Sequence, residues 1–271
     1  MTSPIVSSQW LSNNLRNSNV VILDASLKKN VSGEKSKLQE IQIKGALFFD
    51  LKEKFSDKKN EFPTMFPTAE QFENECRKLG INKSSTIVVY DNIGIYTSPR
   101  VWWMFKTMGH EKVFVLNGGL PDWIQQGFDT ESIKEQEELQ GNFKVNFKPE
   151  KVKYFGFVKS NLETKNVLVV DARSSDRFNS LVPEPRADLR RGNIPNSINI
   201  PYADVLENGK FKSASELKII FEPLEKEERP IVFSCGSGIT ACILLLANSM
   251  VNSSEMVVYD GSWTEWAQRM V

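Results

Sequence analysis

The two halves of this 271-residue chain repeat one another, and this constrains its fold more than any other feature. A continuous apolar run precedes Asp24 in the first half and Asp171 in the second. A later apolar run precedes Asp91 in the first half and Cys235 in the second. These pairs lie 147 and 144 residues apart, and two further blocks repeat at similar separations. Such regular spacing indicates two consecutive copies of one fold.

Within each half, short continuous Val/Ile/Leu runs alternate with helix-like segments. Continuous runs are typical of a parallel sheet covered on both faces, and the alternation favours right-handed crossovers. We therefore predict an α/β protein with two tandem domains, each a parallel sheet with helices on both faces. The segment 131–153 is polar and charged, so we predict a first domain over 1–130, a linker over 131–153 and a second domain over 154–271.

Cys235 is the main candidate for a chemically active residue. It follows the apolar run 231–234 and opens the turn Cys-Gly-Ser-Gly-Ile-Thr-Ala, after which 242–247 read as a buried helix. Inward-pointing N–H groups in such a turn, together with the helix N-terminus, favour a thiolate, which is the nucleophilic form of cysteine. The first half has Asp91 at this position, and a carboxylate cannot act as a sulfur nucleophile. We therefore assign the chemistry to the second domain.

Composition excludes several classes of function. Lys+Arg and Asp+Glu both total 34, so the balanced charge does not predict binding to nucleic acid or to an anionic membrane surface. No apolar run approaches the ~20 residues of a membrane-spanning helix. The first residues show no basic leader, which favours a cytoplasmic location over a mitochondrial one. Three cysteines without a Cys-x-x-Cys pair, and a single histidine, His110, predict neither a disulfide scaffold nor a metal site.

Several motifs join the cysteine turn. They are Ser-Pro-Arg-Val-Trp-Trp-Met-Phe from Ser98, Leu-Asn-Gly-Gly from Leu116, Asp-Ala-Arg from Asp171 and Glu-Pro-Arg from Glu184. Together they resemble the tandem-domain sulfurtransferases, the rhodaneses and 3-mercaptopyruvate sulfurtransferases, over nearly the whole chain. Thiosulfate-using members carry Cys-Arg-Lys-Gly in the turn, whereas Cys-Gly-Ser-Gly at Cys235 is similar to the mercaptopyruvate-using branch.

The resemblance implies a reaction and a set of residues. Cys235 would take sulfur from 3-mercaptopyruvate as a persulfide, release pyruvate, and pass the sulfur to cyanide or to a thiol such as a thioredoxin, with no cofactor. Ser237 would assist, and Arg177 and Arg186 would hold the substrate carboxylate through the planar guanidinium fork. The expected substrate-binding part of the turn consists of Gly236, Gly238, Ile239 and Thr240.

One departure from the family stands out. A Ser–His–Asp relay has been proposed for its mercaptopyruvate-using members. Here Ser237 is present, but Thr64 replaces the histidine, and the aspartate position falls at Lys52 or Glu53. His110 lies elsewhere and is predicted to be structural. We therefore expect a chemistry that does not need the relay.

Other candidate residues are assigned to packing. Arg173 is expected to pair with loop carboxylates, and Arg190 and Arg191 to lie on a solvated face. Cys76 is expected in the core or on the surface of its helix, and Cys242 in the core. The tryptophans are expected at the seam between the domains or in the core near helix starts.

Three alternatives remain open. The sister reaction, thiosulfate to cyanide, shares the fold and the cysteine, but the turn lacks basic residues for a dianion. A cysteine phosphatase would need an arginine at the sixth position after Cys235, where the chain has Ala241. A persulfide relay to a partner protein would need Cys235 but neither Arg177 nor Arg186.

Overall fold

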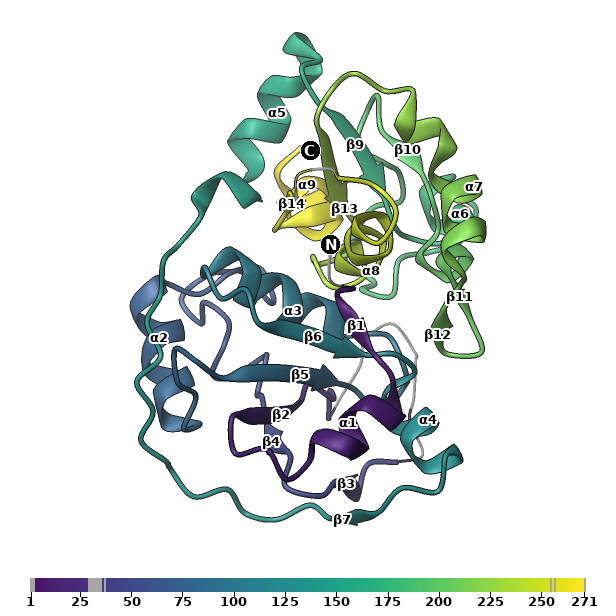
Figure 1. Cartoon of the computed structure of the whole chain (residues 1–271). Coiled ribbons are helices and arrows are strands. Elements are labelled where there is room, and N and C mark those ends of the chain that lie inside the picture. The colour runs from purple at the N-terminus through teal and green to yellow at the C-terminus, as the bar shows by residue number, and fades with distance from the viewer. Residues whose placement is uncertain (1–2, 29–35, 37, 254, 256, 271) are drawn as a thin grey trace.

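The structure is a computed structural model, and it describes residues 3–28, 36, 38–253, 255 and 257–270. Met1 and Thr2, which begin the segment predicted to lack a leader, lie outside the described residues. The chain forms two α/β domains, one above the other in Figure 1, with the N-terminal domain below. In the part of the chain that is described, no helix is long and apolar enough to cross a membrane.

The N-terminal domain is built on a five-stranded parallel sheet in the order β1-β6-β5-β2-β4. Its strands are β1 (Ile5–Val6), β2 (Val20–Asp24), β4 (Leu47–Phe48), β5 (Thr86–Tyr90) and β6 (Val113–Leu116). In the described part of this domain, four helices flank the sheet: α1 (Ser8–Asn14), α2 (Ala69–Lys78), α3 (Ser98–Thr107) and α4 (Gly119–Gln125).

Both faces of this sheet are buried, which explains the continuous apolar runs. Ile22 and Val88 belong to a cluster with residues of α1 and α4. Their neighbours Leu23 and Val89 belong to another cluster with residues of α2 and α3. Successive strand residues point to opposite faces, so an apolar residue is needed at every position.

The C-terminal domain repeats this arrangement in the order β10-β9-β13-β14-β8. Its strands are β8 (Val152–Lys153), β9 (Leu168–Asp171), β10 (Ile198–Asn199), β13 (Ile231–Ser234) and β14 (Val258–Tyr259). Its helices are α5 (Phe155–Thr164), α6 (Ser175–Phe178), α7 (Ala214–Glu225), α8 (Ala241–Ser249) and α9 (Ser262–Arg269). The predicted fold, two tandem parallel-sheet domains flanked by helices, is confirmed.

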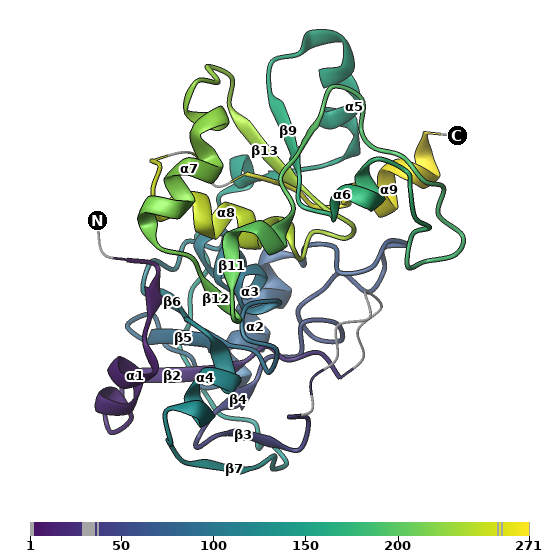
Figure 2. The same cartoon turned by 90° about the vertical axis from the view of Figure 1, so that its right-hand side faces the viewer.

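Two short antiparallel ribbons lie outside the main sheets. One pairs β3 (Ile41–Ile43) with β7 (Thr130–Ser132), and the other pairs β11 (Leu206–Glu207) with β12 (Lys210–Phe211). The second ribbon reaches from the C-terminal domain toward the N-terminal domain (Figure 2), where Lys210 forms an ion pair with Asp122.

The segment predicted as a linker, 131–153, follows the outside of the N-terminal domain (Figure 1). It is attached there by backbone hydrogen bonds and by the fully buried side chain of Phe143. Its first two residues belong to β7, and its last two form β8, the edge strand of the second sheet.

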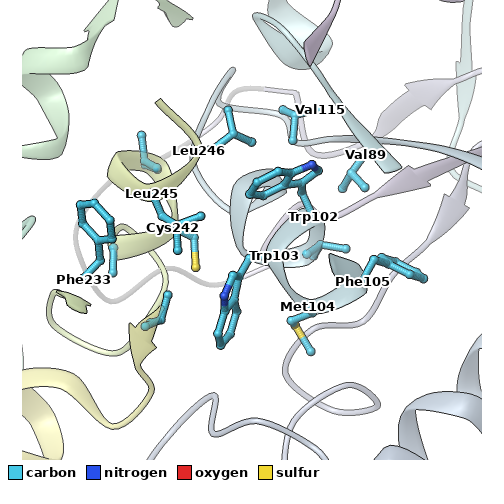
Figure 3. Packing of buried hydrophobic residues seen from close by; sticks show 14 of the residues in the cluster. Val89, Trp102, Trp103, Met104, Phe105, Val115, Phe233, Cys242, Leu245 and Leu246 are labelled. Carbon is cyan, nitrogen blue, oxygen red and sulfur yellow. The ribbon is translucent and has the colours of Figure 1, made fainter. Parts of the chain in front are cut away.

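The two domains share one core because α3 packs against α8. Trp102 and Trp103 of α3 lie beside Cys242, Leu245 and Leu246 of α8 (Figure 3), and all five side chains belong to a cluster that spans both domains.

Two equivalent hydrogen bonds between the domains reinforce this interface. The Asn117 amide oxygen accepts the Phe211 N–H at 3.0 Å, and the Asp260 carboxylate accepts the Phe66 N–H at 2.6 Å. Each hydrogen bond joins the residue that follows a strand of one domain, Asn117 after β6 or Asp260 after β14, to the backbone of the other domain, in β12 or in the loop before α2. The interface therefore holds residues of both domains at fixed positions around the cysteine turn.

Candidate active site

Cys235 follows β13 directly and is 1% exposed. Its N–H donates to the Ser262 hydroxyl at 3.1 Å, and its carbonyl accepts the Trp263 N–H at 2.9 Å. Ser262 has a φ of +50°, a left-handed conformation that is uncommon outside glycine. The first domain has Gly119, with a φ of +54°, at the corresponding position. The start of α9 thus fixes the backbone of the nucleophile.

The turn after Cys235 presents donors for an anion. Among the described residues, no protein oxygen accepts a hydrogen bond from the N–H groups of Ser237, Gly238, Ile239, Thr240 or Ala241. A run of N–H groups at the start of a helix is an anion-binding arrangement. The site can therefore stabilise a thiolate or a persulfide without an imidazole.

A cleft of about 690 Å³ opens over this turn between the two domains. Of the residues predicted for the site, the following line it: Arg177, Arg186, Cys235, Gly236, Ser237, Ile239 and Thr240. Gly238 does not. Its φ is +75°, and a Cβ there would lie 2.8 Å from the Asp260 carbonyl oxygen. Gly238 is needed for the shape of the turn, whereas the prediction placed it in substrate binding.

Arg177 lies beside the turn. A Cβ atom placed on Gly236 would be only 3.1 Å from the Arg177 guanidinium. The guanidinium donates twice to the Glu184 carboxylate, at 2.5 and 3.4 Å. Glu184 is buried and also accepts from Arg173, which in turn binds Asp171. Arg173 therefore pairs with the loop carboxylate of Glu184, as predicted, and also with Asp171 at the end of β9, and this network holds Arg177 beside Gly236.

Arg186 approaches the turn along a second path. It donates to the Thr264 hydroxyl at 3.1 Å, and that hydroxyl donates to the Gly236 carbonyl at 2.6 Å. Burial lowers the pKa of Arg186 from its usual value, and the charge of Arg177 lowers it further, while Asp188 and Cys235 oppose the shift. Two like charges close to a cysteine form a site that attracts an anion.

The N-terminal domain holds the other side of the turn. The Thr64 hydroxyl donates to the Ser237 carbonyl at 2.8 Å. Arg100, fully buried in α3, donates to the carbonyls of Thr64 and Gly238 and forms an ion pair with Asp260 at 2.6 Å. The position that carries histidine in the resembling family thus reaches the turn, but through a hydroxyl.

No imidazole lines the cleft among the residues that the structure describes. His110 packs against Phe105 and Phe143, and its Nε2 lies 2.9 Å from the Ser85 carbonyl, within the N-terminal domain. The structural role predicted for His110 agrees with this placement.

Other predicted packing residues mostly follow expectation. Burial raises the pKa of both other cysteine thiols, to about 12 for Cys242 and well above its usual value for Cys76. Arg190 lies on the solvated surface, as predicted, and it also contacts the final helix. It is exposed, but its guanidinium lies 5.2 Å from the Trp263 ring centre and donates to the Ala267 carbonyl, so it packs against α9.

The sequence did not identify Ser262, Thr264 or Arg100 as site residues. The repeat itself carries a signal for Ser262, because Gly119 holds the same left-handed position in the other copy. Arg100 lies within a motif that was matched to the non-catalytic domain. Its role depends on contacts across more than 130 residues of chain, which local patterns do not encode.

The fold and the cysteine turn define a class of protein. The rhodanese-like domain family matches this chain twice, over residues 7–126 and 156–269. The chain therefore belongs to the rhodanese family and contains two tandem copies of its domain, as the sequence predicted.

Relatives of near full length carry sulfurtransferase names. The chain is 40% identical to thiosulfate/3-mercaptopyruvate sulfurtransferase 1, mitochondrial, of Arabidopsis thaliana, over 98% of this chain and 76% of the relative. It is 36% identical to the human 3-mercaptopyruvate sulfurtransferase, over 98% and 92%. The solved structure of the Escherichia coli enzyme SseA superposes with a TM-score of 0.83 at 33% identity, over 97% of this chain and 99% of that one.

Proposed function

We propose that this chain is a sulfurtransferase that moves sulfur from 3-mercaptopyruvate to a thiol or cyanide acceptor through a persulfide on Cys235. One observation carries the proposal. Cys235 opens a turn with five N–H donors, at the floor of a cleft that Arg177 and Arg186 also line. The cleft thus contains a nucleophile, N–H groups that can bind an anion, and cations that can bind a carboxylate. The sulfurtransferase names of the relatives agree with this reaction.

The first half-reaction balances with the residues present. The Cys235 thiolate attacks the donor sulfur, an S–S bond forms, and the C–S bond of mercaptopyruvate breaks. The electron pair of that bond leaves with the enolate of pyruvate. The proton of the former thiol passes to the enolate carbon, which yields pyruvate and an anionic persulfide. The turn N–H groups from Ser237 to Ala241 then face the persulfide charge.

The second half-reaction needs a nucleophilic acceptor, which takes the outer sulfur and restores the thiolate. Cyanide and small thiols fit the open cleft, and a thioredoxin is the protein acceptor that we propose. All three cysteines are free, which supports a reducing compartment such as the cytoplasm. The mitochondrial name of one relative makes that organelle the alternative to test by localisation.

Thiosulfate is the competing donor. The relatives include a rat thiosulfate sulfurtransferase at 35% identity, while the turn of this chain carries no basic residue. Steady-state turnover of both donors by the same preparation ranks them directly. We expect a higher kcat/KM with mercaptopyruvate.

Intact-mass measurement tests the covalent step. Protein incubated with mercaptopyruvate should gain one sulfur, about 32 Da, and Cys235→Ser should gain none. Cys242→Ser is the matched control, because Cys242 is buried and should leave the gain unchanged. A wild-type protein without added mass, or a Cys235→Ser variant with full turnover, would contradict the proposal.

The two arginines separate substrate turnover from a persulfide relay. Arg177→Ala and Arg186→Ala should each weaken mercaptopyruvate use by about ten- to a hundredfold in kcat/KM, since each removes a charged hydrogen bond. Pyruvate release that stays unchanged in both variants would favour a relay to a partner protein instead.

A further inference from the structure

A buried carboxylate lies beside the cations that line the cleft. Glu184 lines the cleft together with Cys235 and Arg177, yet its side chain is only 1% exposed. One of its oxygens accepts from Arg173 at 2.8 Å and from Arg177 at 3.4 Å, and the other accepts from Arg177 at 2.5 Å. Both oxygens act as acceptors for guanidinium groups, as those of an ionised carboxylate do. A negative charge is therefore buried next to a site that has to bind an anion.

The first domain has the same backbone arrangement without this charge pair. Asp24 ends β2 and Asp171 ends β9, and each carboxylate accepts the N–H of the second residue after it, at 2.8 and 2.9 Å. That second residue is Ser26 in the first domain and Arg173 in the second. The pairing of Arg173 with Glu184 thus belongs to the domain that carries the reactive cysteine. This points to a role in the site rather than in the fold.

Glu184 compensates the charge of Arg177 and leaves part of its guanidinium available. The ion pair uses Nε and one terminal nitrogen, Nη2, of Arg177. Among the described residues, no protein oxygen accepts a hydrogen bond from the other terminal nitrogen, Nη1. Nη2 would lie 3.1 Å from a Cβ on Gly236, so the guanidinium is next to the turn. Arg177 can therefore donate a hydrogen bond to a bound anion while it adds little net charge.

The two candidate sulfur donors differ in charge. Mercaptopyruvate with a protonated thiol carries one negative charge, on its carboxylate, whereas thiosulfate carries two. The Coulomb energy between a donor and a fixed cation is proportional to the charge of the donor. An uncompensated guanidinium at Arg177 would therefore favour thiosulfate more than mercaptopyruvate, and a compensated one removes that advantage.

Other charged side chains line the same cleft. They are the carboxylates of Glu53, Asp57, Glu61 and Asp188 and the cations of Lys52, Lys58 and Arg186. These four carboxylates are exposed or half-buried, so water and salt screen them more than they screen Glu184. A substitution of Glu184 leaves all of these groups in place. Its effect on the two donors can therefore be separated from theirs.

We propose that Glu184 sets the donor specificity of the site. By compensating the charge of Arg177, it favours the singly charged mercaptopyruvate over the doubly charged thiosulfate. Glu184 acts through Arg177, so it is a positioning residue and not a catalytic one. This inference rests on the sulfur transfer proposed above.

The main test is Glu184→Gln, which keeps an acceptor oxygen and removes the charge. The quantity to measure is the donor ratio, defined as kcat/KM for thiosulfate divided by kcat/KM for mercaptopyruvate. It should rise about tenfold, because thiosulfate brings one more charge to the uncompensated Arg177. Glu184→Asp keeps the charge and should leave the donor ratio within about threefold of the wild type. A variant that is merely damaged would lose activity with both donors and would not gain thiosulfate use.

Glu61→Gln is the matched control. Glu61 also lines the cleft and is also paired with an arginine, Arg269 at 3.2 Å, but it is exposed. Loss of a screened carboxylate should leave the donor ratio at the wild-type value.

Arg177→Ala tests the same ion pair in the opposite direction. It removes the contact with both donors and leaves the charge of Glu184 in place. The donor ratio should therefore fall about tenfold, because the repulsion from Glu184 is larger for thiosulfate. This variant tests the inference even if Glu184→Gln does not fold.

Anions without a transferable sulfur test the charge without the reaction. Sulfate is a dianion and pyruvate is a monoanion, and calorimetric titration compares their binding to Cys235→Ser with and without Glu184→Gln. The second substitution should strengthen sulfate binding about tenfold more than pyruvate binding.

Three outcomes would overturn the role of Glu184. They are an unchanged donor ratio in Glu184→Gln, a rise of the same size in Glu61→Gln, and a rise of the same size in Glu184→Asp. Intact mass keeps this result separate from the proposed function. If wild-type protein gains sulfur on Cys235 while the donor ratios do not move, the persulfide reaction stands and only the assignment of Glu184 fails. If it gains none from either donor, the proposed function fails, and the sulfate and pyruvate titrations still decide whether Glu184 sets the preference for anion charge.

Discussion

The cysteine turn and its counterpart in the N-terminal domain use one backbone design in two ways. In the first domain, the Asp91 carboxylate accepts the N–H groups of five residues at 2.9–3.1 Å and the Ser98 hydroxyl at 2.7 Å. The five donors are Ile93, Gly94, Tyr96, Thr97 and Ser98. In the second domain, Cys235 stands at the position of Asp91, and the equivalent turn opens into the cleft.

The difference shows the purpose of the N–H groups that follow Asp91 and Cys235. A permanent carboxylate satisfies the N–H groups of the first turn, so that turn is closed and structural. The second turn replaces the carboxylate by a sulfur atom, which becomes anionic as a thiolate or persulfide. The fold thus contains the same anion site twice. In the first copy the Asp91 carboxylate occupies the site, and in the second copy the site is available to the reactive sulfur of Cys235.

The strongest test of this comparison makes the second turn resemble the first. Cys235→Asp should abolish sulfur transfer completely, because a carboxylate cannot form a persulfide. It should nevertheless fold with a higher Tm than Cys235→Ser, because the turn N–H groups and Arg186 favour a fixed anion. Each kcal/mol gained corresponds to about 2–4 °C in Tm for a chain of this size. A Cys235→Asp protein less stable than Cys235→Ser would show that the two turns are not equivalent.

The reverse change should destabilise the first domain. Asp91→Ala leaves five N–H groups, four of them buried, without their acceptor, so we expect a loss of at least about 3 kcal/mol in the free energy of unfolding. Asp91→Asn, which keeps one acceptor oxygen, should lose less. Chemical denaturation of both variants measures the difference. If Asp91→Ala is as stable as the wild type, the Asp91 carboxylate does not stabilise this turn.

The comparison of the two turns also shows how far sequence reasoning reaches. The repeat, the apolar runs and the pairing of Asp91 with Cys235 are local patterns, and they predicted both sheets and the nucleophile. Arg177 and Arg186 came from short motifs of the resembling family. Hydrogen bonds between the domains, such as that from Thr64 to Ser237, join residues 173 positions apart. No periodicity encodes such contacts, because they depend on how α3 packs against α8.

Gly238 and Lys52 illustrate the limit in opposite directions. A glycine in the turn was assigned to substrate binding, but its backbone conformation and its packing against Asp260 account for it. Lys52 was considered only as a departure from an expected acid, although it lines the cleft. In both cases residue type and spacing identified the segment that contains the residue. The direction in which the element faces required the packed structure.

A smaller effect is expected where the two copies differ at the start of the final helix. Ser262→Gly restores the residue of the first domain, Gly119, and keeps the left-handed backbone. It removes the hydroxyl that accepts the Cys235 N–H, at a cost of about 1–3 kcal/mol for a buried donor left without a partner. We expect a lower Tm and a reduced rate of persulfide formation in single-turnover mass measurements. Ser249→Gly is not an adequate control, because Ser249 is the last residue of α8 and its hydroxyl donates to the Leu246 carbonyl at 2.7 Å. Ser253→Gly, in an exposed loop, is preferable, and both readouts should match the wild type there.

The smallest expected effect concerns the contact of the N-terminal domain with the turn. Thr64→Ala removes the hydrogen bond to the Ser237 carbonyl and should cost about 0.5–1.5 kcal/mol, or roughly two- to tenfold in kcat/KM. Thr64→Ser keeps the hydroxyl and should retain nearly full activity. Because Thr64 has a φ of +59°, Thr64→Gly relieves backbone strain while losing the same bond. Equal turnover in the alanine and serine variants would mean that the hydroxyl does not position the turn. The turn after Cys235 would then be positioned by Arg100 and the C-terminal domain alone.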